Sequence, residues 1–228
     1  NFYNGGGVSI GDINNDGLPD VFFTSNMGEN KLYLNKGNFQ FDDITAKAGF
    51  KQDSMWSTGV TFVDINHDVW LVFYFCNSGH MSNGTRKNKL YINNHNGTFT
   101  ESSEQYGLNI SSFAAQSVFF DYDHDGDLDC YLLNESDRPN QNVVDTSNRR
   151  KYDAHSGDRL LRNDLNTAAK KFIDVSATAG IYQSNLGYGL GLAVADLNND
   201  GWDDIYVGND FHENDYYYVN NGNGTFTE

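Results

Sequence analysis

Short apolar runs alternate with polar, turn-forming segments along the whole chain, and the same order of runs returns four times. In each copy one apolar run leads into an acidic segment and a second apolar run leaves it. A third run, of the KLYLN type, is followed by a fourth of the GTFTE or KFIDVS type after a polar turn. Runs of this length bounded by Gly and Asn predict β-strands, and Asn96-Gly97 is a strong hairpin signal. Each copy therefore predicts four antiparallel strands.

Two independent features mark the repeat, namely the acidic segment and the later KLYLN-type run. The acidic segments read GDINNDGLPDVFF from Gly11, VDINHDVWLVFYF from Val63, FDYDHDGDLDCYL from Phe120 and ADLNNDGWDDIYV from Ala195. The repeats span approximately residues 1–50, 51–108, 109–181 and 182–228, and the third repeat contains an insertion at 134–158.

Four strands in each repeat of about 50–60 residues are typical of β-propeller blades. A β-solenoid would have much shorter repeats, and an immunoglobulin-like array would have longer domains with different patterning. We therefore predict an all-β chain in which 1–228 form a β-propeller segment of four-stranded antiparallel blades. Propellers hold about four to eight blades, so four blades could close a ring alone, but we expect these four to belong to a larger ring.

Composition and charge narrow the classes of partner. The chain has 31 acidic and 15 basic residues, a formal charge of −16, which excludes nucleic acid because phosphate binding needs a basic face. No apolar run reaches the roughly 18 residues of a transmembrane helix. Cys76 and Cys130 lie at offsets of opposite parity from their acidic segments, so we expect two buried, unpaired thiols. We expect the chain to be a processed or truncated piece of a longer protein.

The acidic segments predict metal loops. Oxygen-bearing side chains occupy loop positions 1, 3, 5 and 9, a glycine at position 6 permits a left-handed turn, and position 7 offers its carbonyl oxygen. Hard oxygen ligands favour Ca²⁺ over zinc or copper, and Mg²⁺ prefers more retained water. Position 12 lacks the glutamate of an EF-hand. The three predicted Ca²⁺ sites comprise Asp12, Asn14, Asp16, Leu18 and Asp20; Asp121, Asp123, Asp125, Asp127 and Asp129; and Asp196, Asn198, Asp200, Trp202 and Asp204.

The second acidic loop departs from this pattern. It keeps Asp64, Asn66 and Asp68, but Val69 replaces the glycine and Val72 replaces the last carboxylate. A β-branched residue at positive φ is strained. We therefore predict that this fourth site is weak or empty.

The stretch GLGLAVADLNNDGWDDIYVGND from Gly189, followed by NNGNGTFTE, closely resembles FG-GAP/VCBS repeats. These are the calcium-loop blades of integrin α-subunit propellers and of many secreted bacterial proteins, and the resemblance covers nearly the whole chain. It implies a propeller, Ca²⁺ at the matched Asp and Asn positions, and an extracellular or cell-surface location, with a bacterial outer surface favoured. It says little about activity, because the family includes adhesion modules, lectin-like binders and domains attached to enzymes.

The insertion supplies a candidate ligand loop. Successive antiparallel strands place their connections at alternate ends of a blade, so the insertion lies on the face opposite the calcium loops. An acidic glycan or a protein partner could contact it there; the alternative is a solvated insertion. The residues concerned are Arg138, Arg149, Arg150, Lys151 and Tyr152.

The function that these features favour is a noncatalytic, calcium-stabilised extracellular propeller for adhesion or surface-complex assembly. The alternative is a carbohydrate-binding, lectin-like module or part of a polysaccharide-active enzyme. The six histidines form no HExxH motif. His67 and His124 occupy position 4 of their loops, where we expect them to be exposed and not to coordinate metal.

Overall fold

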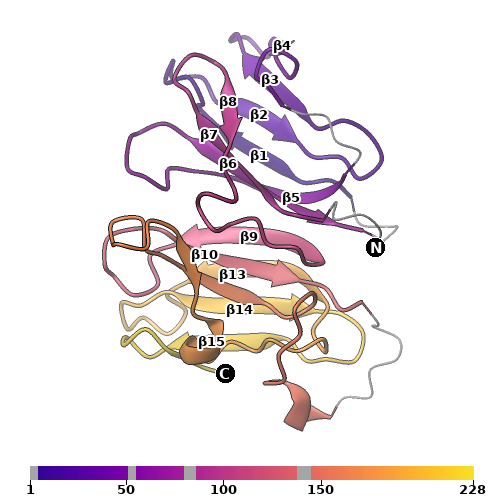
Figure 1. Cartoon of the computed structure of the whole chain (residues 1–228), viewed down its shortest axis with the longest axis vertical. Helices are drawn as coiled ribbons and strands as arrows, with labels where there is room; N and C mark the ends of the chain where they lie inside the picture. Colours follow the sequence, from indigo (N-terminus) through magenta and orange to yellow (C-terminus); the bar gives the residue numbers. More distant parts are fainter. Residues whose placement is uncertain (1–4, 51–54, 80–85, 138–144) are drawn as a thin grey trace. The chain divides into compact units, whose positions relative to one another are not determined.

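The computed structural model describes residues 5–50, 55–79, 86–137 and 145–228. The chain divides into two compact units, Asn1–Ser111 and Ser112–Glu228. Each unit contains two four-stranded sheets whose strands run antiparallel in sequence order (Figure 1). This confirms the prediction of an all-β chain built from propeller-type blades.

The strands of the first unit begin and end close to the apolar runs of the sequence. One acidic loop joins the first two strands of each sheet. The first sheet contains β1 (Val8–Gly11), β2 (Asp20–Phe23), β3 (Lys31–Asn35) and β4 (Phe41–Asp43), and the second contains β5 (Trp56–Val63), β6 (Val72–Ser78), β7 (Lys89–Asn93) and β8 (Phe99–Glu101).

The second unit repeats this order and adds two short helical turns, η1 (Thr146–Asn148) and α1 (Ser176–Ala179). Its first sheet contains β9 (Ala114–Phe120), β10 (Asp129–Asn134), β11 (Arg159–Asn163) and β12 (Phe172–Asp174), and its second contains β13 (Gly189–Ala195), β14 (Asp204–Asn209), β15 (Tyr216–Asn220) and β16 (Phe226–Thr227). No helix among the described residues is long and apolar enough to cross a membrane.

The core of each unit lies between the faces of its two sheets. In the first unit Phe22 of β2 stacks on Phe73 of β6, with ring centroids 4.9 Å apart. In the second unit Ile205 and Val207 of β14 are fully buried, whereas Tyr206 between them is 40% exposed. This alternation is the period of two expected for strands with one covered face. Cys76 and Cys130 are both buried and neither forms a disulfide, as predicted.

A polar tie recurs between the second and third strands of the sheets. In the third sheet the Asn134 N–H donates to Asp158 Oδ1 (2.8 Å), and the Tyr131 hydroxyl donates to Asp158 Oδ2 (2.9 Å). In the second sheet the equivalent residue is Asn88, whose Oδ1 accepts the Asn77 N–H (2.9 Å) and whose Nδ2 donates to the Tyr74 hydroxyl (2.9 Å). A neutral amide therefore serves the same place in the fold as a carboxyl group.

Burial raises the pKa of Asp158 to about 7, from an ordinary value of 3.8. Because the folded state binds this proton more tightly than the unfolded state does, the free energy of unfolding is highest when Asp158 is protonated. It therefore falls as the pH rises from about 4 to about 7. We expect D158N, which copies Asn88, to remove this loss. Relative to the wild type, the variant should gain up to about 4 kcal/mol between pH 4 and pH 8. Urea unfolding of both proteins across this pH range, with chelator present, measures the gain, and parallel pH profiles would contradict it.

Candidate metal centres

The aspartate at position 1 of each acidic loop closes the turn by accepting two backbone N–H groups. Asp121 accepts from Asp125 and Gly126, both at 3.1 Å. Asp12 and Asp196 accept from the same two positions of their own loops, at 2.7–3.2 Å. Each loop thus forms the compact corner between the first and second strands of its sheet.

Two residues of every loop have left-handed backbone angles. Position 6 was expected to do so, and φ is 84° at Gly17, 94° at Gly126 and 92° at Gly201. Position 4 was not expected, although φ there lies between 57° and 60° in all four loops. The signal was present in the sequence, since Asn occupies position 4 in two loops and Asn and His are enriched among non-glycine residues at positive φ.

The aspartate at position 9 is completely buried in the first, third and fourth loops. Asp129 Oδ1 accepts the Asn163 N–H from the third strand (2.7 Å), and Asp129 Oδ2 accepts the Tyr122 N–H from loop position 2 (3.3 Å). Asp20 and Asp204 accept from the equivalent groups at 2.8–3.3 Å. This residue, predicted only as a ligand, therefore also ties the loop to the third strand.

The third loop concentrates the most negative charge. Carboxylate oxygens of Asp121, Asp123 and Asp129 all lie within 4.8 Å of one another. Asp123 Oδ1 is buried and has no hydrogen-bond partner. Burial, followed by the charge of neighbouring aspartates, raises the pKa of Asp123 and raises the pKa of Asp129 to about 8. A cluster of carboxylate oxygens of this kind fits a hard divalent cation, which would satisfy the buried oxygen and offset the repulsion.

The first and fourth loops have the same turn with an asparagine at position 3. The amide Nδ2 of Asn14 donates to Asp16 Oδ2 (2.9 Å), and that of Asn198 donates to Asp200 Oδ2 (2.8 Å). Position 3 of the third loop is Asp123, which has no such amide donor. The backbone N–H groups of Leu18, Asp127 and Trp202 at position 7 donate to the position 5 aspartates at 2.9–3.1 Å. The predicted residues of each set are thus held around one turn.

The second loop adopts the same turn despite its two substitutions. The Val69 N–H donates to Asp64 Oδ2 (2.8 Å), and Val69 has φ of 71°, the strained conformation expected from its position. The imidazole Nε2 of His95 lies 3.4 Å from Asp68 Oδ2 and its ring stacks on Trp70. His95 was not among the predicted residues, because it comes from the turn after β7. A weak or empty site remains the prediction here.

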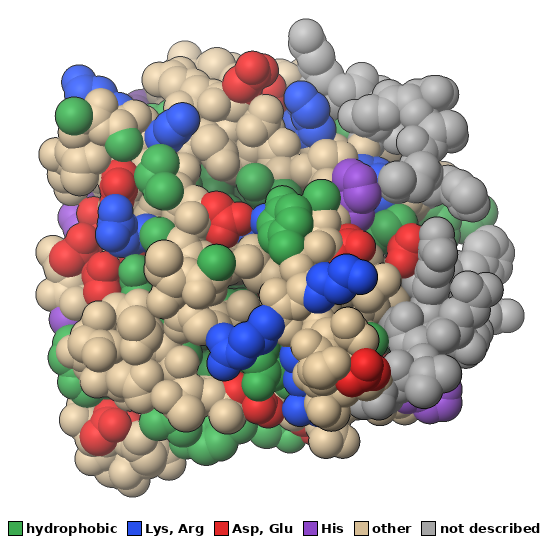
Figure 2. Space-filling view, turned by 60° about the horizontal axis from the view of Figure 1, so that its bottom comes forward, with side chains coloured by type: hydrophobic (Ala, Val, Ile, Leu, Met, Phe, Trp, Pro, Cys, Tyr) green, Lys and Arg blue, Asp and Glu red, His purple; other side chains and the backbone are tan. Residues whose placement is uncertain are grey.

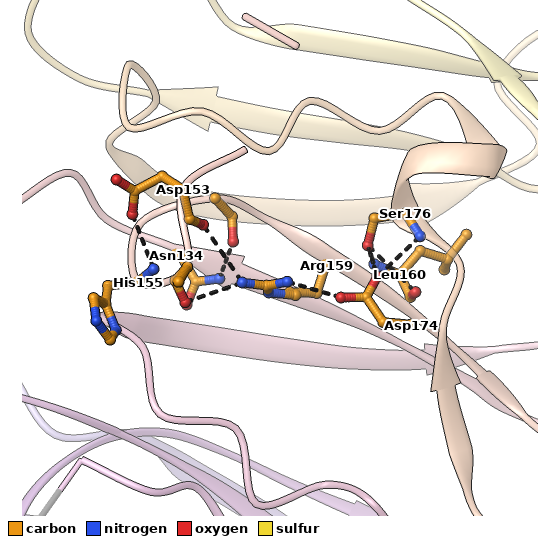
Figure 3. A network of polar contacts seen from close by, with 9 residues as sticks. Asn134, Asp153, His155, Arg159, Leu160, Asp174 and Ser176 are labelled. Atoms are coloured by element: carbon orange, nitrogen blue, oxygen red, sulfur yellow. Dashed lines mark hydrogen bonds and ion pairs between the residues drawn. The ribbon is translucent and has the colours of Figure 1, made fainter. Parts of the chain in front are cut away.

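The base of the insertion is held by an arginine network (Figure 3). The Arg159 guanidinium pairs with Asp174 Oδ2 (2.8 Å) and donates to the Ala154 carbonyl (3.0 Å). Ser176 Oγ in turn donates to Asp174 Oδ1 (2.5 Å), which fixes the carboxylate. Arg159 of β11 therefore anchors the segment around Ala154 to the third sheet.

The basic residues of the insertion divide into paired and exposed ones. Arg149 donates to Glu213 Oε1 (2.6 Å), and the Glu213 side chain is fully buried. Arg149 therefore forms an ion pair within the protein. Arg150 and Lys151 are exposed, and Tyr152 is 60% exposed. Arg138 lies outside the described residues. On the face drawn in Figure 2, basic side chains stand apart from one another among acidic and uncharged ones.

Comparison with known proteins gives both family and relatives. The family model for the FG-GAP-like repeat matches residues 12–75 and 73–132, and that for the FG-GAP repeat matches 188–225. Cartilage acidic protein 1 from Xenopus tropicalis is 25% identical over 208 residues, 91% of this chain and 29% of that protein.

The Homo sapiens protein of the same name is 25% identical over 206 residues, 90% of this chain and 28% of its own length. The chain therefore spans less than a third of these relatives. The matched residues include all four acidic loops and the strand that follows each of them. Because the family models match more than half of its 228 residues, the chain belongs to the FG-GAP-like repeat family.

Proposed function

We propose that this chain is a noncatalytic, calcium-stabilised binding or scaffold segment of a β-propeller, acting outside the cell or at its surface. The observation that carries the proposal is the third acidic loop. There three carboxylates converge within 4.8 Å and one buried oxygen, Asp123 Oδ1, has no hydrogen-bond partner. Such a site favours Ca²⁺, which takes six to eight oxygen ligands in flexible geometry.

Calcium would act by stabilising the corners between strands. Asp121, Asp123 and Asp125 would supply carboxylate oxygens, and Asp127 its backbone carbonyl. With a dissociation constant of about 10–100 μM and calcium near 1 mM, each occupied loop contributes roughly 1.5–3 kcal/mol by mass action. The first and fourth loops would hold ions with the equivalent residues, and the second would hold one weakly or not at all.

An uncovered sheet face supports a place in a larger assembly of blades. In the first sheet Val8 is 55% exposed and Phe23 is 46% exposed. The equivalent residues of the second sheet, Val60 and Phe75, are 8% and 4% exposed because they pack in the core between the two sheets of the first unit. The same sequence positions are thus buried where a preceding sheet covers them. A further blade covering β1–β4 would bury the first set in the same way.

The fourth sheet leaves exposed the face that points away from the core of the second unit. Tyr206 and Tyr217 pair across β14 and β15 and are 40% and 37% exposed. Their counterparts in the third sheet, Tyr131 and Leu160, are completely buried in the core of the second unit. Both halves of a blade-to-blade contact are therefore present on this chain, which favours a scaffold built from more such blades.

The proposed partner and location are supported by the exposed basic residues of the insertion, the acidity of the chain and the names of its relatives. A glycan or protein partner on the insertion face would meet Arg150, Lys151 and Tyr152, since Arg149 is engaged with Glu213. The relatives are named as acidic proteins of cartilage, and an acidic chain with calcium loops suits a calcium-rich exterior. A bacterial outer surface rests on the sequence resemblance alone, because the relatives named above are from vertebrates. The carbohydrate-binding alternative would need the same exposed residues of the insertion.

The calcium proposal predicts that D123A removes one bound ion from the intact chain. The loss follows because Asp123 contributes the buried oxygen without a partner in the third loop. Isothermal titration with Ca²⁺ should show a stoichiometry lower by about one, and the calcium-dependent rise in melting temperature should shrink. D210A, which removes an exposed carboxylate of the same unit outside the acidic loops, should change neither quantity. Equal stoichiometry in D123A and the wild type would refute this site.

The scaffold proposal predicts that the double variant I10K/F23K reduces self-association of the isolated chain. These side chains are 65% and 46% exposed, so charging them should cost less than about 0.5 kcal/mol of stability. Sedimentation at increasing protein concentration and binding of a hydrophobic dye measure the effect. A large loss of stability with unchanged association would mean that the chain itself already covers this face, and would contradict the proposal.

A further inference from the structure

The acidic loops of one unit are joined to each other by a buried asparagine. In the second unit Asn220 Nδ2 donates to the Tyr122 carbonyl of the third loop (2.9 Å) and to the Asp203 carbonyl of the fourth (3.2 Å). In the first unit Asn93 makes the same pair of bonds, to the carbonyls of Ile13 and Leu71. Position 2 of one loop is therefore connected to position 8 of the next.

A stacked ring pair adds a second link in the second unit. The imidazole of His124, at position 4 of the third loop, lies on the indole of Trp202, at position 7 of the fourth. The ring centroids are 3.9 Å apart and the planes differ by 11°. His124 has a left-handed φ of 57°, and its side chain points away from its own loop toward Trp202.

Trp202 is also held from another side. A Cβ atom on Gly222 would come within 2.9 Å of the Trp202 ring atoms Nε1 and Cε2, so the turn after β15 lies directly against the indole. The backbone N–H of Trp202 donates to Asp200 Oδ1 (2.9 Å). This bond holds Trp202, whose backbone carbonyl is the predicted position 7 ligand, next to a carboxylate of the fourth loop. Trp202 is thus positioned by the third loop, the β15–β16 turn and its own loop.

We propose that the third and fourth loops bind their ions cooperatively, and that the His124–Trp202 stack and Asn220 connect them. The inference rests on the proposed calcium function. Ordering of the turn from Asp121 to Asp129 fixes Tyr122 and His124, and through them the position of Trp202. The fourth loop then loses less conformational entropy when it closes, which is a coupling free energy between two sites. His124 is in this role a positioning residue that coordinates nothing itself.

The first unit provides a natural contrast. There position 4 of the first loop is Asn15, whose Nδ2 donates to the Val69 carbonyl at 3.4 Å, beyond the usual range of about 2.7–3.2 Å for an N–H···O hydrogen bond. Among the described residues, no ring stacks on His67, the position 4 residue of the second loop. H67N is therefore a matched control for H124N. Both variants keep the left-handed turn, because Asn occupies position 4 in the first and fourth loops.

The test follows the Trp202 indole N–H signal by NMR during titration of the full chain with Ca²⁺, the signal being assigned with W202F. Disabling the third loop with D123A should weaken calcium binding at the fourth loop roughly three- to tenfold, the range that a stacked aromatic pair can supply. H124N alone should weaken it by a similar factor. Adding D123A to H124N should then change the affinity less than twofold, and H67N should leave the wild-type behaviour intact.

Two results would overturn the coupling without touching the metal proposal. One is a calcium affinity at the fourth loop that is the same in D123A as in the wild type. The other is an equal effect of D123A with and without His124, which would assign the coupling to long-range charge. Absence of any Trp202 response to calcium in the intact chain, together with no heat of binding, would instead refute the metal proposal and this inference with it.

Discussion

One buried carboxylate holds each intact corner of this protein together. The aspartate at position 9 accepts an N–H from the loop and another from the end of the third strand, so it joins three segments of a sheet at one point. A buried carboxylate is costly unless it is hydrogen-bonded, and even with these bonds burial and neighbouring charge raise the pKa of Asp129 to about 8. The corner is therefore well defined in shape but rich in negative charge, which is the condition that favours a bound cation.

The second sheet shows what happens when this carboxylate is lost. Val72 occupies position 9 there, yet Asp64 still accepts the backbone N–H groups of Asp68 and Val69, and Asn93 still donates to the carbonyls of two loops. The fold of the corner thus survives on backbone hydrogen bonds and core packing, while the charge that would attract an ion is reduced. His95 lies beside Asp68 in this loop, with its Nε2 3.4 Å from Asp68 Oδ2. Corner shape and metal affinity are separable properties of the repeat.

The insertion illustrates how an unusual sequence feature can have a structural role. Its arginines looked like a ligand surface on an acidic chain, but Arg149 is paired with the buried Glu213 and its guanidinium lies 5.9 Å from the ring centroid of Tyr182. The pair anchors the insertion to the fourth sheet. The exposed basic and aromatic residues that remain are Arg150, Lys151 and Tyr152, a smaller surface than the sequence suggested.

The sequence by itself determined the four-stranded repeat, the acidic corners and the burial of two cysteines that form no disulfide. These features depend on alternation within a strand and on turn-forming residues a few positions apart, so they can be recognised locally. The strained Val69 was predicted for the same reason. Only the tertiary structure decided which loops touch. Asn220 and Tyr122 are 98 residues apart, and Arg149 and Glu213 are 64 apart. Such contacts arise when whole sheets pack face to face, and nothing in the local pattern of either partner encodes that pairing.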